Sequence, residues 1–129
     1  MWKEITICIT IIVVVIVGNY ITQKYTDETV QEINSGLNNL KDEILKNNSN
    51  QEKIKSSVDD VEKTWDNRRD KLAYYLEHDE LEKVEAHITS LKSFIETEEY
   101  PEAICELDNS IFVLKHIEEK YAYSVENLF

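Results

Sequence analysis

Proline, glycine and cysteine are scarce in this chain. One Pro and two Gly in 129 residues leave little to punctuate β-strands with turns, so the composition predicts an all-helical protein. The two cysteines are Cys8, inside a long apolar run, and Cys105, so no disulfide framework is expected. We interpret Cys105 as a small apolar residue of the core.

The motifs that usually carry chemistry are also missing. There is no HxxxH, CxxC or EF-hand spacing, and two isolated glycines cannot form a phosphate loop. His78 with Asp79 and Glu82 is the one candidate metal cluster, but it falls short of a full ligand set, so we interpret Asp79 as a helix cap. His87 and His116 lie just beside apolar stripes and are expected to be half-buried and bonded to carboxylates. The sequence therefore predicts no enzymatic activity, no cofactor and no metal.

Basic residues are few in the C-terminal half. The net charge is −12, and residues 22–76 carry nine basic and eleven acidic side chains, whereas residues 77–129 carry four and fourteen. Such an acidic half repels nucleic acid and anionic headgroups, so no nucleic-acid partner is expected. A positively charged partner or a divalent cation is electrostatically compatible, although a solvated acidic face is the simpler interpretation.

What the sequence does have is a long apolar run near its beginning. From Ile5 to Val17 twelve of thirteen residues are β-branched, and no charge occurs between Glu4 and Lys24. A single span in lipid must be a helix, because each backbone polar group has to find its partner within the segment. Trp2 to Ile21 as a helix is about 30 Å long, the thickness of the hydrocarbon layer. We therefore predict a single-pass membrane anchor.

A cleaved signal peptide is the alternative for this run. Cleavage after Gly18 would release the body as a secreted factor that begins at Asn19. Against this, a signal peptide has a positively charged region before its apolar run, whereas here the only basic side chain before the run is Lys3, and Glu4 offsets its charge. The positive charges at Lys3 and Lys24 slightly favour a cytoplasmic N-terminus, which places the body of the chain outside the cytoplasm.

Apolar residues then recur at 3-4-3-4 spacing, which is typical of helices in bundles or coiled coils. We favour a helix to about residue 46 and a second to about Glu77, with a break at Asn47–Asn50, where Ser49 and Glu52 suggest a capping box. The unbroken register favours one long helix instead. The first stripe, a candidate for self-association, is Val30, Ile33, Leu37, Leu40 and Ile44.

Two further stripes predict an antiparallel helix hairpin at the C-terminal end. The third runs from Leu81 to Ile95, and Pro101 marks the start of the fourth helix. The fourth stripe is Ile104, Leu107, Ile111, Leu114, Tyr121, Val125 and Leu128. The expected architecture is all-α, with an anchor (1–21), a helical stalk or first bundle helix (22–48) and an acidic helical bundle (49–129).

A few aromatic and basic residues are candidates for partner binding. Trp and Arg dominate interface hot spots, so Trp65, Arg68 and Arg69 form one such group, and Tyr121 and Tyr123 add amphipathic edges. We prefer a core position for Trp65, since it falls on the apolar stripe, with the two arginines paired to the acidic hairpin.

Several residues resemble an uncharacterised bacterial family, domain of unknown function 4363. They are Trp65, the segment Leu76–Leu81, Leu107, His116–Ile117 and Glu126–Phe129. The resemblance covers roughly Trp65 to the end plus the N-terminal run and leaves Thr22–Thr64 unexplained. It implies a small membrane-tethered helical protein of anaerobic spore-forming bacteria, often encoded beside multi-pass membrane proteins, with no assigned activity.

Two classes of function follow. The first is a membrane-tethered interaction or scaffold module that docks on a membrane protein or associates with itself. The second is an extracytoplasmic sensor of a small cation or solute, which would need a partner's span because only Met1–Glu4 lies across the membrane. We favour the first, because the narrow stripe near the membrane is typical of association and a catalytic set is missing.

Overall fold

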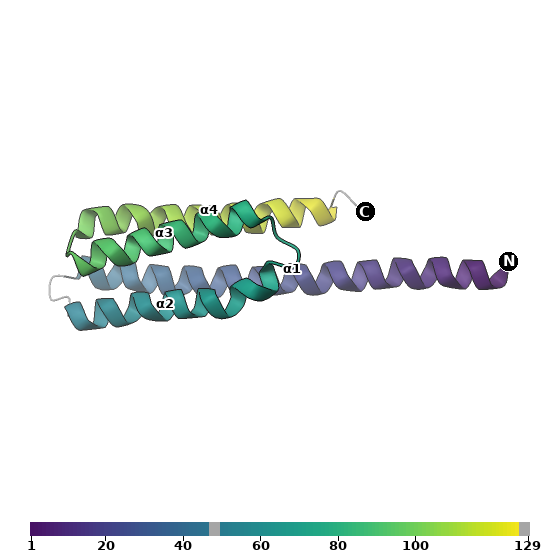
Figure 1. Ribbon diagram of the computed structural model, residues 1–129, viewed down its shortest axis with the longest axis horizontal. Coiled ribbons are helices and arrows are strands. Elements are labelled where there is room, and N and C mark those ends of the chain that lie inside the picture. The colour runs from purple at the N-terminus through teal and green to yellow at the C-terminus, as the bar shows by residue number, and fades with distance from the viewer. Residues whose placement is uncertain (47–49, 127–129) are drawn as a thin grey trace.

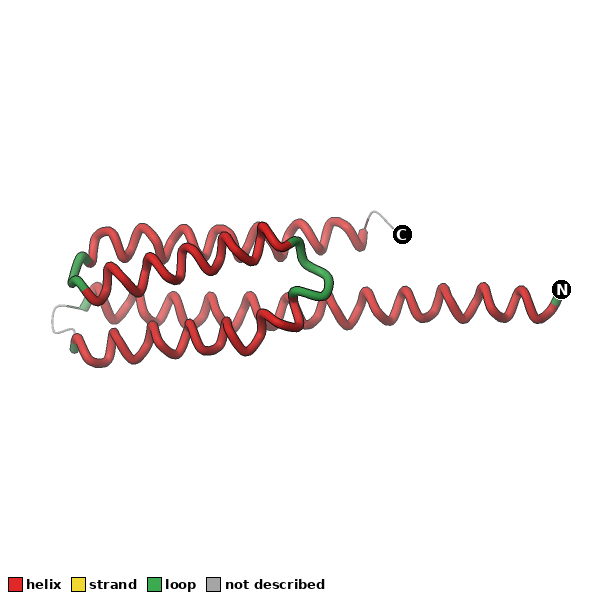
Figure 2. Tube along the Cα trace, viewed as in Figure 1, coloured by secondary structure: helices red, strands yellow, loops and turns green. Residues whose placement is uncertain are grey.

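Four helices connected in up-down-up-down order make up the protein in a computed structural model, which describes residues 1–46 and 50–126 and the side chains up to residue 122 (Figures 1 and 2). They are α1 (Trp2–Leu45), α2 (Gln51–Leu72), α3 (His78–Glu96) and α4 (Tyr100–Glu126). All regular secondary structure in these ranges is helical, which confirms the all-α prediction.

The first helix has two halves with different surroundings. Its N-terminal half projects alone from the bundle (Figure 1), and every residue from Met1 to Gly18 is exposed. The most apolar 18-residue window has a mean hydropathy of 2.4 and no buried residue. By length and composition this segment can cross a membrane, although a signal sequence has the same properties. It is the one such helix in the described part of the chain.

The C-terminal half of α1 belongs to the bundle. Helices α1 and α2, α2 and α3, α3 and α4, and α4 and α1 pack against each other, so that each helix has two neighbours. The pairing of α3 with α4 is the most extensive, as expected for the predicted hairpin. The fully buried large side chains come from all four helices: Trp65, Ile33, Leu37, Leu40, Ile54, Leu81, Ile88, Leu91, Ile95, Leu107, Leu114 and Ile117.

The predicted break after the first bundle helix is confirmed, with two changes of detail. Asn50 caps α2 by accepting a hydrogen bond from the Glu52 N–H at 3.0 Å, whereas the proposed capping residue Ser49 lies outside the described residues. Helix α2 ends at Leu72 rather than Glu77, and a further turn follows in which the Leu76 N–H donates to the Leu72 carbonyl at 2.8 Å.

The start of α3 corrects the interpretation of Asp79. The N-cap position is Glu77, which makes no side-chain capping bond, and the helix begins at His78. Asp79 instead lies in the first turn, where its negative charge interacts favourably with the positive end of the helix dipole. The prediction placed the cap two residues late because Asp is the commoner capping residue.

Helix α3 ends in a left-handed turn without glycine. Glu98 has φ of 60°, and the Glu99 N–H donates to the Phe94 carbonyl at 2.8 Å while the Glu98 N–H donates to the Ile95 carbonyl at 3.2 Å. This pair of bonds is a Schellman motif, which usually has Gly at the left-handed position. The sequence therefore offered no signal for it.

The inward face of α4 differs from the predicted stripe. Its buried residues are Ala103, Leu107, Ser110, Leu114 and Ile117, whereas Ile104 and Ile111 are only half-buried. The small side chains of Ala103 and Ser110 are fully buried in the helix that packs most extensively against α3. Cys105 is consequently exposed, so its prediction as a core residue is wrong.

Candidate interaction surface

The residues predicted for self-association lie inside the bundle. Val30, Ile33, Leu37 and Leu40 are each 2 % exposed or less, and Ile44 is half-buried against the core. Their stripe is covered by α2 and α4 of the same chain, because both of these helices pack against α1. In this fold the stripe is not available to a second copy, so the prediction of a self-association surface here is wrong.

Trp65 is also a core residue and is only 2 % exposed. Its indole N–H is buried without a hydrogen-bond partner among the described residues. Because a partner cannot reach this side chain without opening the bundle, its candidacy as a partner-binding residue is wrong and its preferred core position holds.

The two arginines connect different pairs of helices. The Arg68 guanidinium donates to the Glu32 carboxylate at 2.6 Å and lies 5.1 Å from the centre of the Tyr25 ring, so it ties α2 to α1 rather than to the hairpin. Arg69 pairs with Glu85 on α3, as predicted. Both side chains are engaged within the chain.

The candidate tyrosines lie near the end of the bundle that faces the projecting half of α1. The Tyr121 hydroxyl accepts a hydrogen bond from the Glu77 N–H at 3.1 Å, so it fixes the α2–α3 connection to α4. The Tyr75 hydroxyl donates to the Thr22 carbonyl at 3.1 Å, and Tyr74 beside it is 89 % exposed. The side chain of Tyr123 lies outside the described part.

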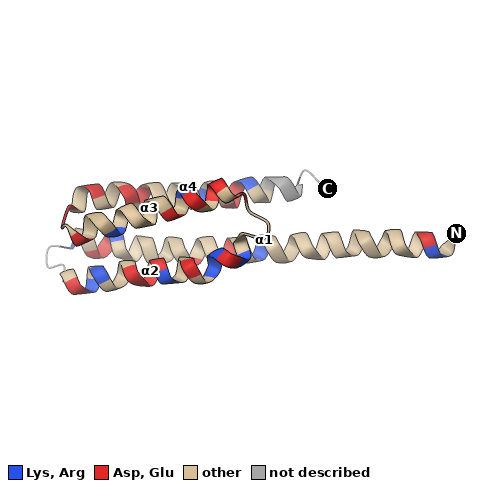
Figure 3. Cartoon of the chain, in the orientation of Figure 1, with Lys and Arg blue, Asp and Glu red and all other residues tan. Residues whose placement is uncertain are grey.

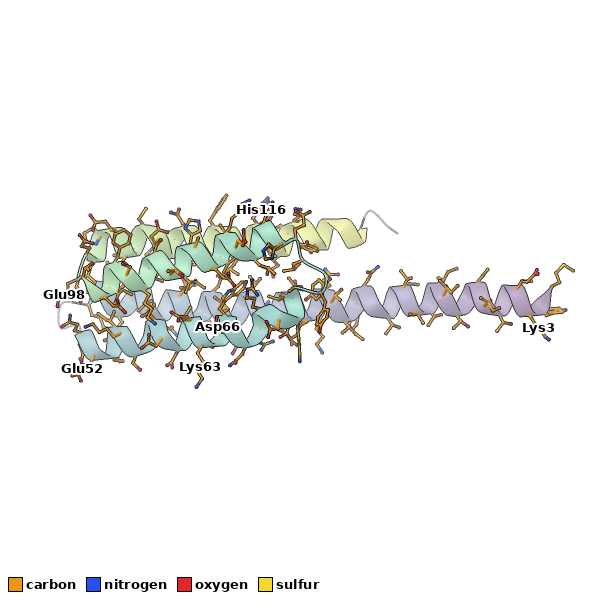
Figure 4. The ribbon with its side chains drawn as sticks, in the orientation of Figure 1. Lys3, Glu52, Lys63, Asp66, Glu98 and His116 are labelled. Atoms are coloured by element: carbon orange, nitrogen blue, oxygen red, sulfur yellow. The ribbon has the colours of Figure 1, made fainter. Side chains whose placement is uncertain are left out.

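The three histidines do not form a site. The His78 ring lies 2.9 Å from Glu82, one turn along α3, and the His87 ring lies 2.7 Å from Glu106 on α4, as expected for a half-buried histidine. His116 is exposed and points away from the bundle (Figure 4), contrary to the expectation that it is half-buried. No group of three or more His, Cys, Asp or Glu side chains able to hold a metal occurs among the residues described.

The outward face of α4 is a surface that sequence reasoning missed. Phe112 is 72 % exposed there, and Cys105, Asn109, Phe112 and His116 follow one another at 4-3-4 spacing along the helix. We call these four residues the α4 outer stripe. The stripe itself contains no acidic or basic side chain other than the histidine, and the exposed charged residues Asp108, Lys115 and Glu119 flank it on a bundle surface that is rich in charge (Figure 3). The sequence signal for this surface was the 4-3-4 spacing of these four residues, which runs beside the spacing that was interpreted as the core stripe.

Ion pairs connect the helices around the bundle. Lys41 reaches Asp108 at 2.9 Å between α1 and α4, and Lys92 reaches Glu62 at 3.1 Å and Asp59 at 3.2 Å between α3 and α2. Exposed pairs of this kind contribute little stability individually. Together with the pairs of Arg68 and Arg69 they favour one register of the four helices over shifted ones.

Two carboxylates between α1 and α4 are destabilised in their charged form. Partial burial raises the pKa of Asp27. Burial also raises the pKa of Glu118, and the negative charges of Asp27 and Glu119 add to the effect while Lys115 opposes it. A carboxyl whose pKa is higher in the folded state makes folding less favourable at neutral pH.

Replacing Glu118 with Gln is expected to raise the unfolding midpoint at pH 7, because it removes this unfavourable charge. The folded protein takes up the Glu118 proton at higher pH than the unfolded chain does. The advantage of the variant should therefore shrink as pH falls through the folded pKa and vanish below the ordinary value of 4.5. Thermal unfolding followed by circular dichroism from pH 7 to pH 4 measures it. Asp60→Asn, at an exposed position in the middle of α2, is the charge control, and an equal rise in both variants would contradict the explanation.

Among the described residues, the cavities between helices are small and the grooves are open to solvent. An apolar cavity of about 10 Å³ lies beside Trp65, Thr29 and Leu114, which is no larger than a single water needs. A surface groove of about 210 Å³ between α1 and α2 is lined by residues that include Glu32, Asn39 and Asp60.

Comparison with known proteins identifies a family and no individual relative. No curated protein and no solved structure matches the chain. A family described as DUF4363, a domain of unknown function, matches residues 20–128. The match extends the resemblance found in the sequence, because it includes the segment Thr22–Thr64 that had remained unexplained, and it leaves out residues 1–19. The match covers most of the chain, and the protein therefore belongs to the DUF4363 family.

Proposed function

We propose that the protein is a membrane-tethered interaction module without catalytic activity, which holds a rigid helical bundle at the membrane surface for a membrane protein partner. The observation that carries the proposal is the continuity of α1. One unbroken helix of 44 residues contains both the apolar segment and a core helix of the bundle. With no hinge between them, a bundle anchored in this way has a defined height and direction relative to the bilayer.

The α4 outer stripe is the surface that we assign to the partner. Aromatic side chains in the centre of a weakly charged patch are typical of interfaces. Phe112 is an exposed aromatic side chain with the uncharged Asn109 on one side of it and the charged Asp108 and Lys115 on the other. By contrast, Trp65 is buried and the two arginines are paired within the chain. The stripe runs along the side of the bundle, where a second protein in the same bilayer would lie. The slight charge bias around the apolar segment supports an extracytoplasmic position for the bundle.

Site-specific photo-crosslinking in native membranes tests this proposal. A benzophenone amino acid at Phe112 is expected to give a discrete cross-linked product that contains another membrane protein. The same probe at Lys63, which is exposed on α2, should give none. A product of twice the chain mass of 15.2 kDa would identify a second copy as the partner and keep the interaction role in its self-associating form. Recovery of the monomer alone from both positions would overturn the interaction role.

A further inference from the structure

The height of each part of the bundle above the bilayer follows from α1, provided that the proposed anchor is correct. A helix rises about 1.5 Å per residue, so Trp2–Ile21 spans about 30 Å of hydrocarbon and Thr22 lies directly beyond it. The headgroup layer outside the hydrocarbon is about 5–7 Å thick on each side. Groups level with Thr22 and the next turn of α1 therefore lie among the lipid headgroups.

The connection between α2 and α3 is bonded to this turn of α1. The Tyr75 hydroxyl donates to the Thr22 carbonyl at 3.1 Å and lies 2.8 Å from the Thr26 hydroxyl. Figure 1 shows the same arrangement: the α2–α3 connection is at the end of the bundle from which the apolar half of α1 emerges. The start of α2, where Glu52 is labelled in Figure 4, and the α3–α4 connection, where Glu98 is labelled, are at the opposite end.

The side chains at this level suit a lipid interface. Tyr74 is 89 % exposed and Tyr20 on α1 is 67 % exposed, so neither aromatic ring is covered by the protein. Tyrosine is enriched at membrane interfaces because its ring is apolar and its hydroxyl is hydrated. Lys71 lies in the last turn of α2, 5.5 Å from the centre of the Tyr25 ring, where it can reach a phosphate. Glu77 at the same end is paired with Lys120 at 3.3 Å, which limits repulsion by its carboxylate.

We propose that the α2–α3 connection is a second membrane contact, in which Tyr74 lies in the lipid headgroup layer beside the exit of α1. The contact holds the bundle upright, because a tilt toward α4 would lift Tyr74 out of the interface. The protein is then attached to the membrane at two points, the spanning helix and the interfacial connection. Together they fix the orientation of the bundle around the axis of α1.

Depth-dependent fluorescence quenching of the full-length protein in phosphatidylcholine nanodiscs tests this inference. In a Cys8→Ala, Cys105→Ser background, single cysteines at Ala73, Ile11 and Lys55 carry the same environment-sensitive dye. Ala73 is exposed beside Tyr74, Ile11 is within the apolar segment, and Lys55 is exposed near the opposite end of the bundle. The dye at Ala73 should emit at shorter wavelength than at Lys55. Quenching by headgroup and acyl-chain nitroxides should place it about 15–20 Å from the bilayer centre.

The pattern of results separates this inference from the proposed function. If the dye is quenched at Ile11 while Ala73 behaves like Lys55, the second contact is wrong and the anchor stands. If Ile11 is not quenched either, the anchor and the proposal built on it both fail. Tyr74→Ser should reduce the quenching at Ala73, since it removes the interfacial ring. Unchanged quenching would show that the Tyr74 ring does not make the membrane contact.

Discussion

Replacing Ile12 and Val15 together with lysine is expected to release the protein from the membrane. On insertion scales a charged residue at the centre of a helical span costs about 2.5–3.5 kcal/mol, so two lysines cost about 5–7 kcal/mol. The measurement is the share of the chain that remains in the membrane pellet after high-salt and alkaline washing. Ile12→Leu with Val15→Leu is the matched control and should leave the chain in the pellet.

The same variant should leave the bundle intact. No residue from Met1 to Ile21 is buried, so the core does not depend on the apolar segment. The unfolding midpoint of the bundle in micelles should therefore be unchanged by the two lysines. The anchor itself would be refuted by a wild-type chain that is removed from membranes by salt alone. An intact mass that corresponds to a chain beginning at Asn19 would show instead that the segment is a cleaved signal sequence.

Trp65→Ala is expected to lower the free energy of unfolding by about 3–5 kcal/mol, which is the usual cost of truncating a large buried aromatic residue. Trp65 is 2 % exposed and adjoins a cavity lined by residues of α1, α2 and α4, which include Thr29, Leu72 and Leu114. Such a loss is a large part of the about 5–15 kcal/mol that stabilises a typical domain. Denaturant unfolding of the full chain in micelles, followed at 222 nm, measures it.

Two control variants show which property of Trp65 matters. Trp65→Phe should cost much less, because it keeps most of the apolar volume and removes an indole N–H that has no hydrogen-bond partner. Lys63→Ala, at an exposed position on the same helix, should change stability by no more than about 0.5 kcal/mol. If Trp65→Ala left stability unchanged but reduced cross-linking, Trp65 would belong to the interface and its position in the core would be refuted.

The ion pairs show which kinds of contact the sequence can and cannot predict. Arg69 pairs with Glu85 on α3, as its position opposite an acidic hairpin suggests. Arg68 directly precedes it in the chain but pairs with Glu32 on α1. Adjacent residues of a helix point about 100° apart, so they meet different neighbours. Charge counts over whole segments cannot distinguish these neighbours.

The helices, the apolar segment and the approximate breaks between helices could be predicted from the sequence, because these depend on local composition and on periodicity along the chain. The end of α2 at Leu72 and the start of α3 at His78 differ by a few residues from the prediction. Which side of each helix faces inward depends on how the four helices pack together, and the sequence did not predict it everywhere. On α4 the small residues Ala103 and Ser110 lie in the core, and Cys105 and Phe112 are left at the surface. The stripe from Val30 to Ile44 is likewise covered by the chain's own helices rather than by a second copy, because burial depends on which helices are neighbours in space.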